Sequence, residues 1–423
     1  MNAARPSRRG VLTGAAVVGA AGVGVGVSAL AGRDTATTTA TAAAAASTVA
    51  FHGARQAGIV TPAQESLVFA ALDVTSRNPA DLADVLQRWS EATATMTTGV
   101  PVGGPGGLGG APGEPPQDTG EAHELPAANL TVTLGYGPSL FDERFGLAER
   151  RPANLEELPA LPGEQLDPTK CGGDLCLQAC ADDPQVAFHA IRNLVRIGRG
   201  VVTVRWMQLG FGRTSTTSST QATPRNLMGF KDGTANLRAE DTADLDRFVW
   251  VGGEGSPAVD QEWMRGGTYL VARRIRMLIE SWDRASLREQ ERVIGRAKVS
   301  GAPLSGTGEF DALDLAKTSA TGKPAIDVAA HVRLAAPETN GGMRMLRRGY
   351  SYTDGLDLAT GQLDAGLFFI VFGNDPASQF VAVQRKLGAK DALTEYLKHT
   401  GSAIFACPPG ISAGGSWGEG LFT

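Results

Sequence analysis

The sequence predicts an α+β fold made of two ferredoxin-like domains in tandem, each an antiparallel sheet with helices on one face. The spacing of apolar residues changes repeatedly between that of strands and that of helices, and the resulting order β-α-β-β-α-β occurs twice along the chain. A length of 423 residues, of which 42% are hydrophobic, is sufficient for two domains with full cores.

The first repeat begins with Ser66–Val74, an uninterrupted apolar run typical of a buried strand. Pro79–Thr97 follows with apolar residues at helical spacing, and Asn129–Gly137 alternates β-branched residues as strands do. Asp183–Ile197 has one apolar helical face, and Pro184 suits its first turn. The remaining strands of this repeat are expected at 173–179 and 201–211.

The second repeat has the same order of elements. Its first strand is expected at Thr268–Ile275, and a helical segment follows in which Ser286 and Glu289 form a capping box. The remaining elements are expected as strands at 345–352, 367–373 and within 396–407, and as a helix at 378–387.

The first thirty residues are predicted to be a targeting segment. Ser7–Leu12 contains the paired arginines of a twin-arginine signal, and the run that follows is richer in glycine than a typical transmembrane helix. Ala29–Ala31 fits a cleavage site, while a later cut or an uncleaved anchor are the alternatives. We therefore expect export by the twin-arginine pathway to an extracellular, periplasmic or cell-envelope location. Because this pathway carries folded proteins, it also favours a cofactor protein.

The domain boundaries follow from these features. The Gly- and Pro-rich residues 99–120 are expected to form a surface loop inside a domain. The chain is divided into a signal peptide at 1–31, an Ala/Thr-rich tether at 32–50, an N-terminal domain at 51–225 and a C-terminal domain at 226–423.

The charge of the chain argues against two classes of partner. Removal of residues 1–31 would take away three arginines and bring the formal net charge from −5 to −8. An acidic protein without a basic stripe is unsuited to nucleic acid, and it has no electrostatic reason to sit on anionic lipid. We expect no stable membrane insertion, and the oligomeric state is left open.

The four cysteines do not form a recognised cofactor motif. Cys171, Cys176 and Cys180 are spaced C-x4-C-x3-C, which is neither the C-x-x-C-H of covalent haem attachment nor an iron–sulfur spacing. Together with Cys407 they are expected to form one or two disulfides, or to be buried thiols.

Two segments contain residue types that suit chemistry. His331 is one of five histidines and follows a long loop, although a lone histidine is more often structural than a ligand. In Gly229–Asn236 (GFKDGTAN), two glycines flank Asp232 and would let backbone approach a ligand closely. The alternative for Asp232 is a turn in which its side chain bonds its own backbone.

Together these segments resemble a known family. Gly229–Asn236 resembles the G-F-x-D-G-T-x-N signature of dye-decolourising peroxidases, His331–Ala336 resembles the segment with that family's proximal histidine, and Met345–Tyr352 resembles the strand with its distal arginine. The resemblance covers most of residues 51–410 and is strongest to the exported branch that includes the deferrochelatase/peroxidase of bacterial ferrous-iron uptake. One departure is Glu338, where many relatives have a basic residue.

The resemblance implies haem b in the C-terminal domain, with His331 as the axial ligand of the iron. It also implies that Asp232 and Arg347 act on hydrogen peroxide, with Arg348 as the rival for the arginine. Asp364 is a candidate acceptor for the second ring nitrogen of His331. The further cofactor-binding residues are expected to be Gly233, Thr234 and Ala235 along the haem, with Arg274 and Arg333 at the propionates or in surface salt bridges.

The expected activity is reduction of hydrogen peroxide with oxidation of dyes, phenols or similar small donors. The alternatives are a deferrochelatase, which removes iron from haem, and a haem carrier without turnover. Electrons from bulky donors could pass through aromatic residues, although core packing is the simpler role for each of them. The candidates are Trp206, Trp263, Trp282, Tyr350 and Tyr352.

Overall fold

The computed structural model describes residues 48–422, so the predicted signal peptide and most of the tether lie outside the described residues. The first half contains the six predicted elements in the predicted order. They are β1 (Ser66–Val74), α2 (Pro79–Met96), β2 (Thr131–Tyr136), β3 (Leu175–Ala181), α3 (Pro184–Ile197) and β4 (Val202–Arg213). Asn78 and Asp183 cap the two helices through their side chains, and a proline follows each cap.

The second half contains more elements than predicted. They are α4 (Thr242–Phe248), β5 (Thr268–Met277), α5 (Ile279–Trp282), α6 (Leu287–Ile294), α7 (His331–Ala335), β6 (Leu346–Arg347), β7 (Tyr350–Asp357), β8 (Gln362–Gly373), α8 (Ala382–Lys390) and β9 (Leu397–Cys407). A π-helical turn, Ala377–Val381, leads into α8. The predicted strand at 345–352 is divided into β6 and β7, and both pieces pair with β8. Between them, Gly349 accepts a hydrogen bond from the backbone of Thr214, and β7 also pairs with β4.

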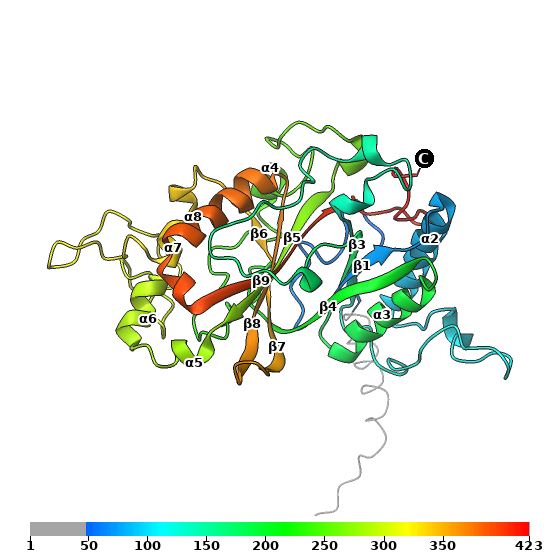
Figure 1. Cartoon of the computed structure of the whole chain (residues 1–423), viewed down its shortest axis with the longest axis horizontal. Coiled ribbons are helices and arrows are strands. Elements are labelled where there is room, and N and C mark those ends of the chain that lie inside the picture. The colour runs from blue at the N-terminus through cyan, green and yellow to red at the C-terminus, as the bar shows by residue number, and fades with distance from the viewer. Residues whose placement is uncertain (1–47, 423) are drawn as a thin grey trace, which may run out of the picture. The chain divides into compact units, whose positions relative to one another are not determined.

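Nine strands form one sheet in the order β5-β9-β2-β3-β1-β4-β7-β8-β6, and β5 also pairs with β8. All the paired strands are antiparallel. Within the first half the order is β4-β1-β3-β2, and within the second it is β9-β5-β8-β7. The halves are joined through β4–β7 and β2–β9, so the strand pairs form a closed circuit. Figure 1 shows β1, β3 and β4 beside the strands of the second half.

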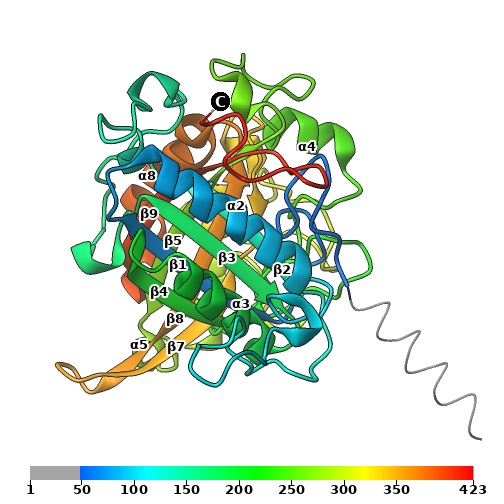
Figure 2. The ribbon, with the colours of Figure 1, turned by 90° about the vertical axis from the view of Figure 1, so that its right-hand side faces the viewer.

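Strand β1 shows why the sequence of the first strand is apolar at almost every position. Val68, Ala70 and Leu72 face the core beneath α2 and α3, which cross the outer face of this half (Figure 2). Leu67 and Phe69 face the opposite way, into a second core shared with the other half. Since successive side chains of a strand point to opposite faces, a strand buried on both faces needs apolar residues throughout.

A third, smaller core supports residues 225–236, the motif loop, which contains the G-F-K-D-G-T segment. Phe230, from the G-F-K-D-G-T segment, packs with Trp282 of α5 at a ring-centroid separation of 5.9 Å. The indole N–H of Trp282 donates to the carbonyl of Met228. The start of the motif is therefore fixed to the helices that follow β5. In residues 48–422, no helix is both long and apolar enough to span a membrane.

Candidate functional site

His331 is the first residue of α7, and its ring is oriented by a buried carboxylate. Its Nδ1 lies 2.6 Å from Oδ2 of Asp391, whose side chain is 3% exposed. The other oxygen of Asp391 accepts the backbone N–H of Leu393, so the carboxylate is fixed at both ends. Asp364, the acceptor suggested by the sequence, instead pairs with Arg274 at 2.9 Å. The structure thus corrects that prediction to Asp391.

The other ring nitrogen of His331 is open. In the part of the chain that the structure describes, Nε2 has no hydrogen-bond partner, and 34% of this side chain is exposed. Burial alone would lower the pKa of His331, but the charge and hydrogen bond of Asp391 and the charge of Asp232 raise it, against an opposing effect of Arg347. The net pKa of His331 is raised, and the charges of Asp232 and Arg347, the two predicted distal residues, both affect it.

Asp232 faces Arg347, and its carboxylate does not cap its own backbone. Its Oδ1 accepts a 3.0 Å hydrogen bond from Arg347, and its Oδ2 accepts one of 3.2 Å from Asn226. Gly233 follows with φ +88°, and a Cβ at this position would lie 2.7 Å from the Cα of Ser215. Backbone cannot yield as a flexible side chain does, so the loop requires glycine here.

Asn236, the last residue of the motif, joins the motif loop to β6. Its amide donates to the carbonyl of Arg347 and its oxygen accepts the N–H of the same residue, both at 2.8 Å. The sequence motif included Asn236 but gave it no role. These two hydrogen bonds fix the backbone of Arg347 opposite Asp232, although the two segments are far apart in the chain.

The two adjacent arginines point to opposite faces, as successive side chains of a strand do. Arg347 is 31% exposed at the site, whereas Arg348 is fully buried and donates to the carbonyl of Thr61 and the side chain of Gln64. Arg348 therefore links the two halves, which leaves Arg347 as the arginine beside Asp232.

The remaining predicted cofactor-binding residues divide into two groups. Thr234 and Ala235 continue the motif loop, and Arg333 lies on α7 with donors directed to the carbonyls of Ile326 and Leu315. Arg274 requires a correction, because its buried guanidinium is bonded to Gln208, Thr400, Asp354 and Asp364 and stacks on Tyr352. This network occupies Arg274, so a role at a haem propionate does not fit. Glu338 is exposed.

The cysteines are free thiols, which is the second of the two expected states. Cys176, Cys180 and Cys407 are buried and Cys171 is half-buried. A Cβ at Gly135 would lie 2.8 Å from Sγ of Cys176 and 3.1 Å from Sγ of Cys407, so this glycine separates two thiols from different halves. Among the described residues, no group of three or more His, Cys, Asp or Glu side chains could hold a metal ion.

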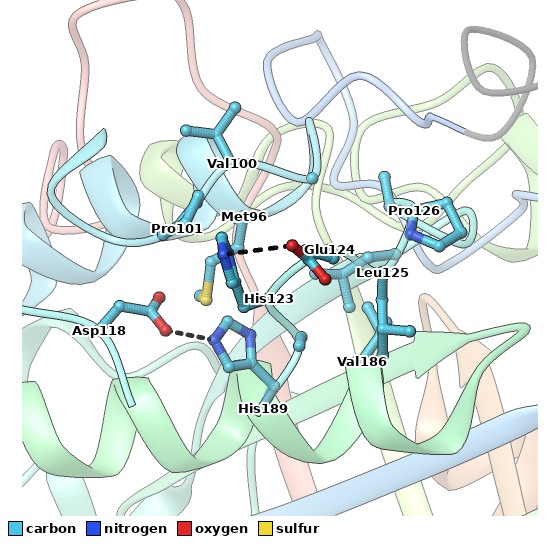
Figure 3. Close-up of a pocket in the computed structure, with 14 residues that line it drawn as sticks. Met96, Val100, Pro101, Asp118, His123, Glu124, Leu125, Pro126, Val186 and His189 are labelled. Carbon is cyan, nitrogen blue, oxygen red and sulfur yellow. Dashed lines mark hydrogen bonds and ion pairs between the residues drawn. The ribbon is translucent and has the colours of Figure 1, made fainter. Parts of the chain in front are cut away.

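A pocket of about 40 Å³ in the first half has a structural explanation (Figure 3). Nε2 of the buried His189 lies 2.9 Å from Asp118, which also accepts the N–H groups of Val102 and Gly120. Burial alone would raise the pKa of Asp118, but these hydrogen bonds lower it. The pair attaches the Gly- and Pro-rich loop to α3, so His189 has a structural role here.

Comparisons with known proteins cover nearly all of the described chain. The family profile described as Dyp-type peroxidase, N-terminal, matches residues 56–212, and the one described as Dyp-type peroxidase, C-terminal, matches residues 223–412. A curated relative from Yersinia pseudotuberculosis, named deferrochelatase, is 40% identical over 371 residues, which are 86% of this chain and 82% of the relative. A deferrochelatase of Escherichia coli K12 is 38% identical over 85% of this chain and 84% of its own.

Solved structures are similar to the same extent. DtpA from Streptomyces lividans, in an oxyferrous complex, has a TM-score of 0.80 and 40% identity, covering 89% of this chain and 98% of its own. A DyP-type peroxidase from Streptomyces coelicolor has a TM-score of 0.79 and 40% identity, with coverage of 89% and 97%.

Proposed function

Because the chain belongs to the Dyp-type peroxidase family, and is therefore a haem-dependent peroxidase, we propose that it binds haem b through Nε2 of His331 and activates hydrogen peroxide with Asp232 and Arg347. The observation that carries this assignment is that His331, Asp232 and Arg347 come together from three separate segments. Arg347 donates a hydrogen bond to Asp232, and the charges of both affect the pKa of His331.

The residues present fit a haem. A haem iron needs one axial imidazole nitrogen, and His331 offers an open Nε2 while Asp391 holds its Nδ1. A hydrogen-bonded carboxylate of this kind fixes the tautomer of a ligating histidine and makes it more basic. Arg333, whose partners among the described residues are backbone carbonyls, remains our candidate for a propionate contact. Gly233, Thr234 and Ala235 are proposed to follow the haem.

When bound, haem supplies the iron and the redox chemistry of the reaction. Asp232 is proposed to take a proton from one peroxide oxygen and to deliver it to the other, as a general base and then a general acid. Arg347 stabilises negative charge on the leaving oxygen, and its bond to Asp232 orients the carboxylate for the transfer. Small donors then return the electrons.

The decisive experiment is stopped-flow mixing of haem-loaded protein with peroxide, with the Soret band as readout. Asp232→Asn and Arg347→Ala are each expected to slow the spectral change by about 10²- to 10⁴-fold while haem remains bound. Asp84→Asn, which alters an exposed carboxylate paired with Arg88, is the matched control. An Asp232→Asn protein that reacts as fast as the wild type would remove Asp232 from the mechanism.

The names of the Yersinia and Escherichia relatives favour a second candidate activity, the release of iron from haem with the porphyrin left intact. Fluorescence of iron-free porphyrin, measured after incubation of the haem-loaded protein with a reductant, tests it. Growth of porphyrin emission that depends on His331 would support this activity, and unchanged emission would exclude it under these conditions. A haem carrier without turnover is not favoured, because carriage alone needs neither Asp232 nor Arg347.

The architecture and location of the protein complete the proposal. The strand orders β4-β1-β3-β2 and β9-β5-β8-β7 support two ferredoxin-like domains, with boundaries near 51–225 and 226–423 and the haem in the second. The paired arginines in Ser7–Leu12 support export by the twin-arginine pathway. Replacement of Arg8 and Arg9 by lysine should retain the protein in the cytoplasm, and continued export would contradict this route.

A further inference from the structure

Glu309 contacts one residue before Asp232 and one after it in the motif loop. Its carboxylate forms an ion pair with Lys231 and accepts a hydrogen bond of 3.2 Å from the hydroxyl of Thr234. The side chains of Glu309 and Lys231 are only 10% and 25% exposed, so both charges are largely withdrawn from water. Burial alone would raise the pKa of Glu309, but the hydrogen bonds from Lys231 and Thr223 and the charge of Lys231 lower it. The carboxylate is therefore ionised at neutral pH.

The segment that contains Glu309 is itself attached to the same loop. Arg296 is buried and donates hydrogen bonds to the carbonyls of Gly301 and Glu309, at 2.7 and 2.9 Å. Arg225, at the start of the motif loop, donates to the carbonyls of Lys298 and Val299. Residues 296–311 thus form a fixed support behind residues 225–234.

Lys231 and Asp232, although adjacent in the chain, have different ion-pair partners. Lys231 is adjacent to Asp232 in the chain, yet its ammonium group is paired with Glu309, while Arg347 pairs with Asp232. The other charged groups beside this cluster include Lys298, over the ring of Phe230, and Arg225, which donates to the carbonyl of Gly229. They also include His331, whose pKa is raised by the charge of Asp232, and Arg296, whose pKa is affected by the charges of Glu309 and Arg347. With Lys231 neutralised, Arg347 is the direct ion-pair partner of Asp232 among the described residues.

We propose that Glu309 is a positioning residue for peroxide activation. It holds residues 231 and 234 so that the carboxylate between them faces Arg347, and it keeps the charge of Lys231 away from that carboxylate. The inference rests on the proposed role of Asp232, and it adds a residue that contacts neither peroxide nor iron. Small displacements of a reacting group have large kinetic effects, about 10²-fold for 1 Å.

The test compares Glu309→Gln, Lys231→Met and the double variant Lys231→Met/Glu309→Gln in the haem-loaded protein. Glu309→Gln keeps the shape of the side chain, and Glu262→Gln, in an exposed pair with Arg265, is the matched control. The readouts are the bimolecular rate of the peroxide-induced Soret change, its pH profile, the haem content and the resting Soret band. Asp232→Asn is measured alongside.

Glu309→Gln should lower the peroxide rate by about 10- to 100-fold with haem content and resting spectrum unchanged. Its acid limb should move to lower pH because Lys231 is left unpaired, whereas Lys231→Met should move the limb to higher pH because Glu309 is left unpaired. The double variant should restore the limb but not the rate. A wild-type rate and profile in Glu309→Gln, or a rate loss that only follows haem loss, would overturn the inference. A wild-type rate in Asp232→Asn would overturn the role of Asp232 and this inference together.

Discussion

The choice of carboxylate behind His331 depends on geometry that a single sequence does not contain. Asp391 lies sixty positions from His331 in the chain and reaches it because α8 packs beside α7. Asp364 carries the same functional group but is bound to Arg274 on the sheet. The motif and the strand with two arginines, by contrast, were readable as short segments, and Asp232 and Arg347 do meet in space. Residues defined by a local motif could be predicted, and their distant supports could not.

Replacement of Asp391 by Asn tests this support directly. An amide is a weaker acceptor for the Nδ1 proton, so His331 should become a less basic ligand and haem affinity should fall by about 10- to 100-fold. Haem titration followed at the Soret band measures the change, and Asp364→Asn is the control because it lies in the Arg274 network. If the Asp364 variant lost haem and the Asp391 variant did not, the assignment of the acceptor would have to be reversed.

At the scale of elements, strands and long helices were predicted well, because each has a regular apolar spacing. The misses were the short helices α4 and α7 and the division of the strand predicted at 345–352 into β6 and β7. A helix of five residues such as α7 has too few positions for a helical spacing to appear, and the division at Gly349 depends on a contact with Thr214 from the other half. Such elements are fixed by tertiary contacts.

Asp174 makes tertiary contacts at the junction of β1, β3 and the loop after β2. Its buried carboxylate accepts bonds from Arg144, Ser139 and the backbone of Val74. Burial alone would raise the pKa of Asp174, but these bonds lower it. Asp174→Asn should therefore lower the free energy of unfolding by about 2–3 kcal/mol at neutral pH.

The pH dependence of that loss has a definite sign. A carboxylate whose pKa is lowered by folding stabilises the protein above its unfolded value of about 4, and this contribution disappears as the pH falls through the folded pKa. The difference between Asp174→Asn and wild type in urea unfolding should therefore be larger at pH 6 than at pH 3. A difference that grows toward acid would show that the carboxylate is not stabilised by these bonds.

At the scale of the whole described molecule, two cysteines lie in the core where the halves pack together. Cys176 on β3 and Cys407 on β9 lie in the shared core, and burial raises the pKa of both. A thiol reagent should thus modify at most Cys171 in the native protein and all four cysteines after unfolding. Detection of fewer than four thiols in the unfolded, unreduced protein would instead indicate a disulfide.

The shared core also predicts how the molecule unfolds. Phe69 of β1 is fully buried and packs against Trp206 of its own half and against Phe368 and Phe405 of the other, at ring-centroid separations of 5.3, 5.2 and 6.0 Å. Because both halves contribute to this core and to one circuit of strands, they should unfold together. Phe69→Ala should lower the free energy of unfolding by about 3–5 kcal/mol.

Urea unfolding followed by tryptophan fluorescence and by far-ultraviolet circular dichroism measures this, with Phe188→Ala as the control because that side chain is 41% exposed. The two signals should give one midpoint, and Phe69→Ala should shift both equally. If the variant shifted only one of two separate transitions, the two halves would unfold independently. The placement of Asp232 relative to His331 could then not depend on the shared core, and the site would belong to the second half alone.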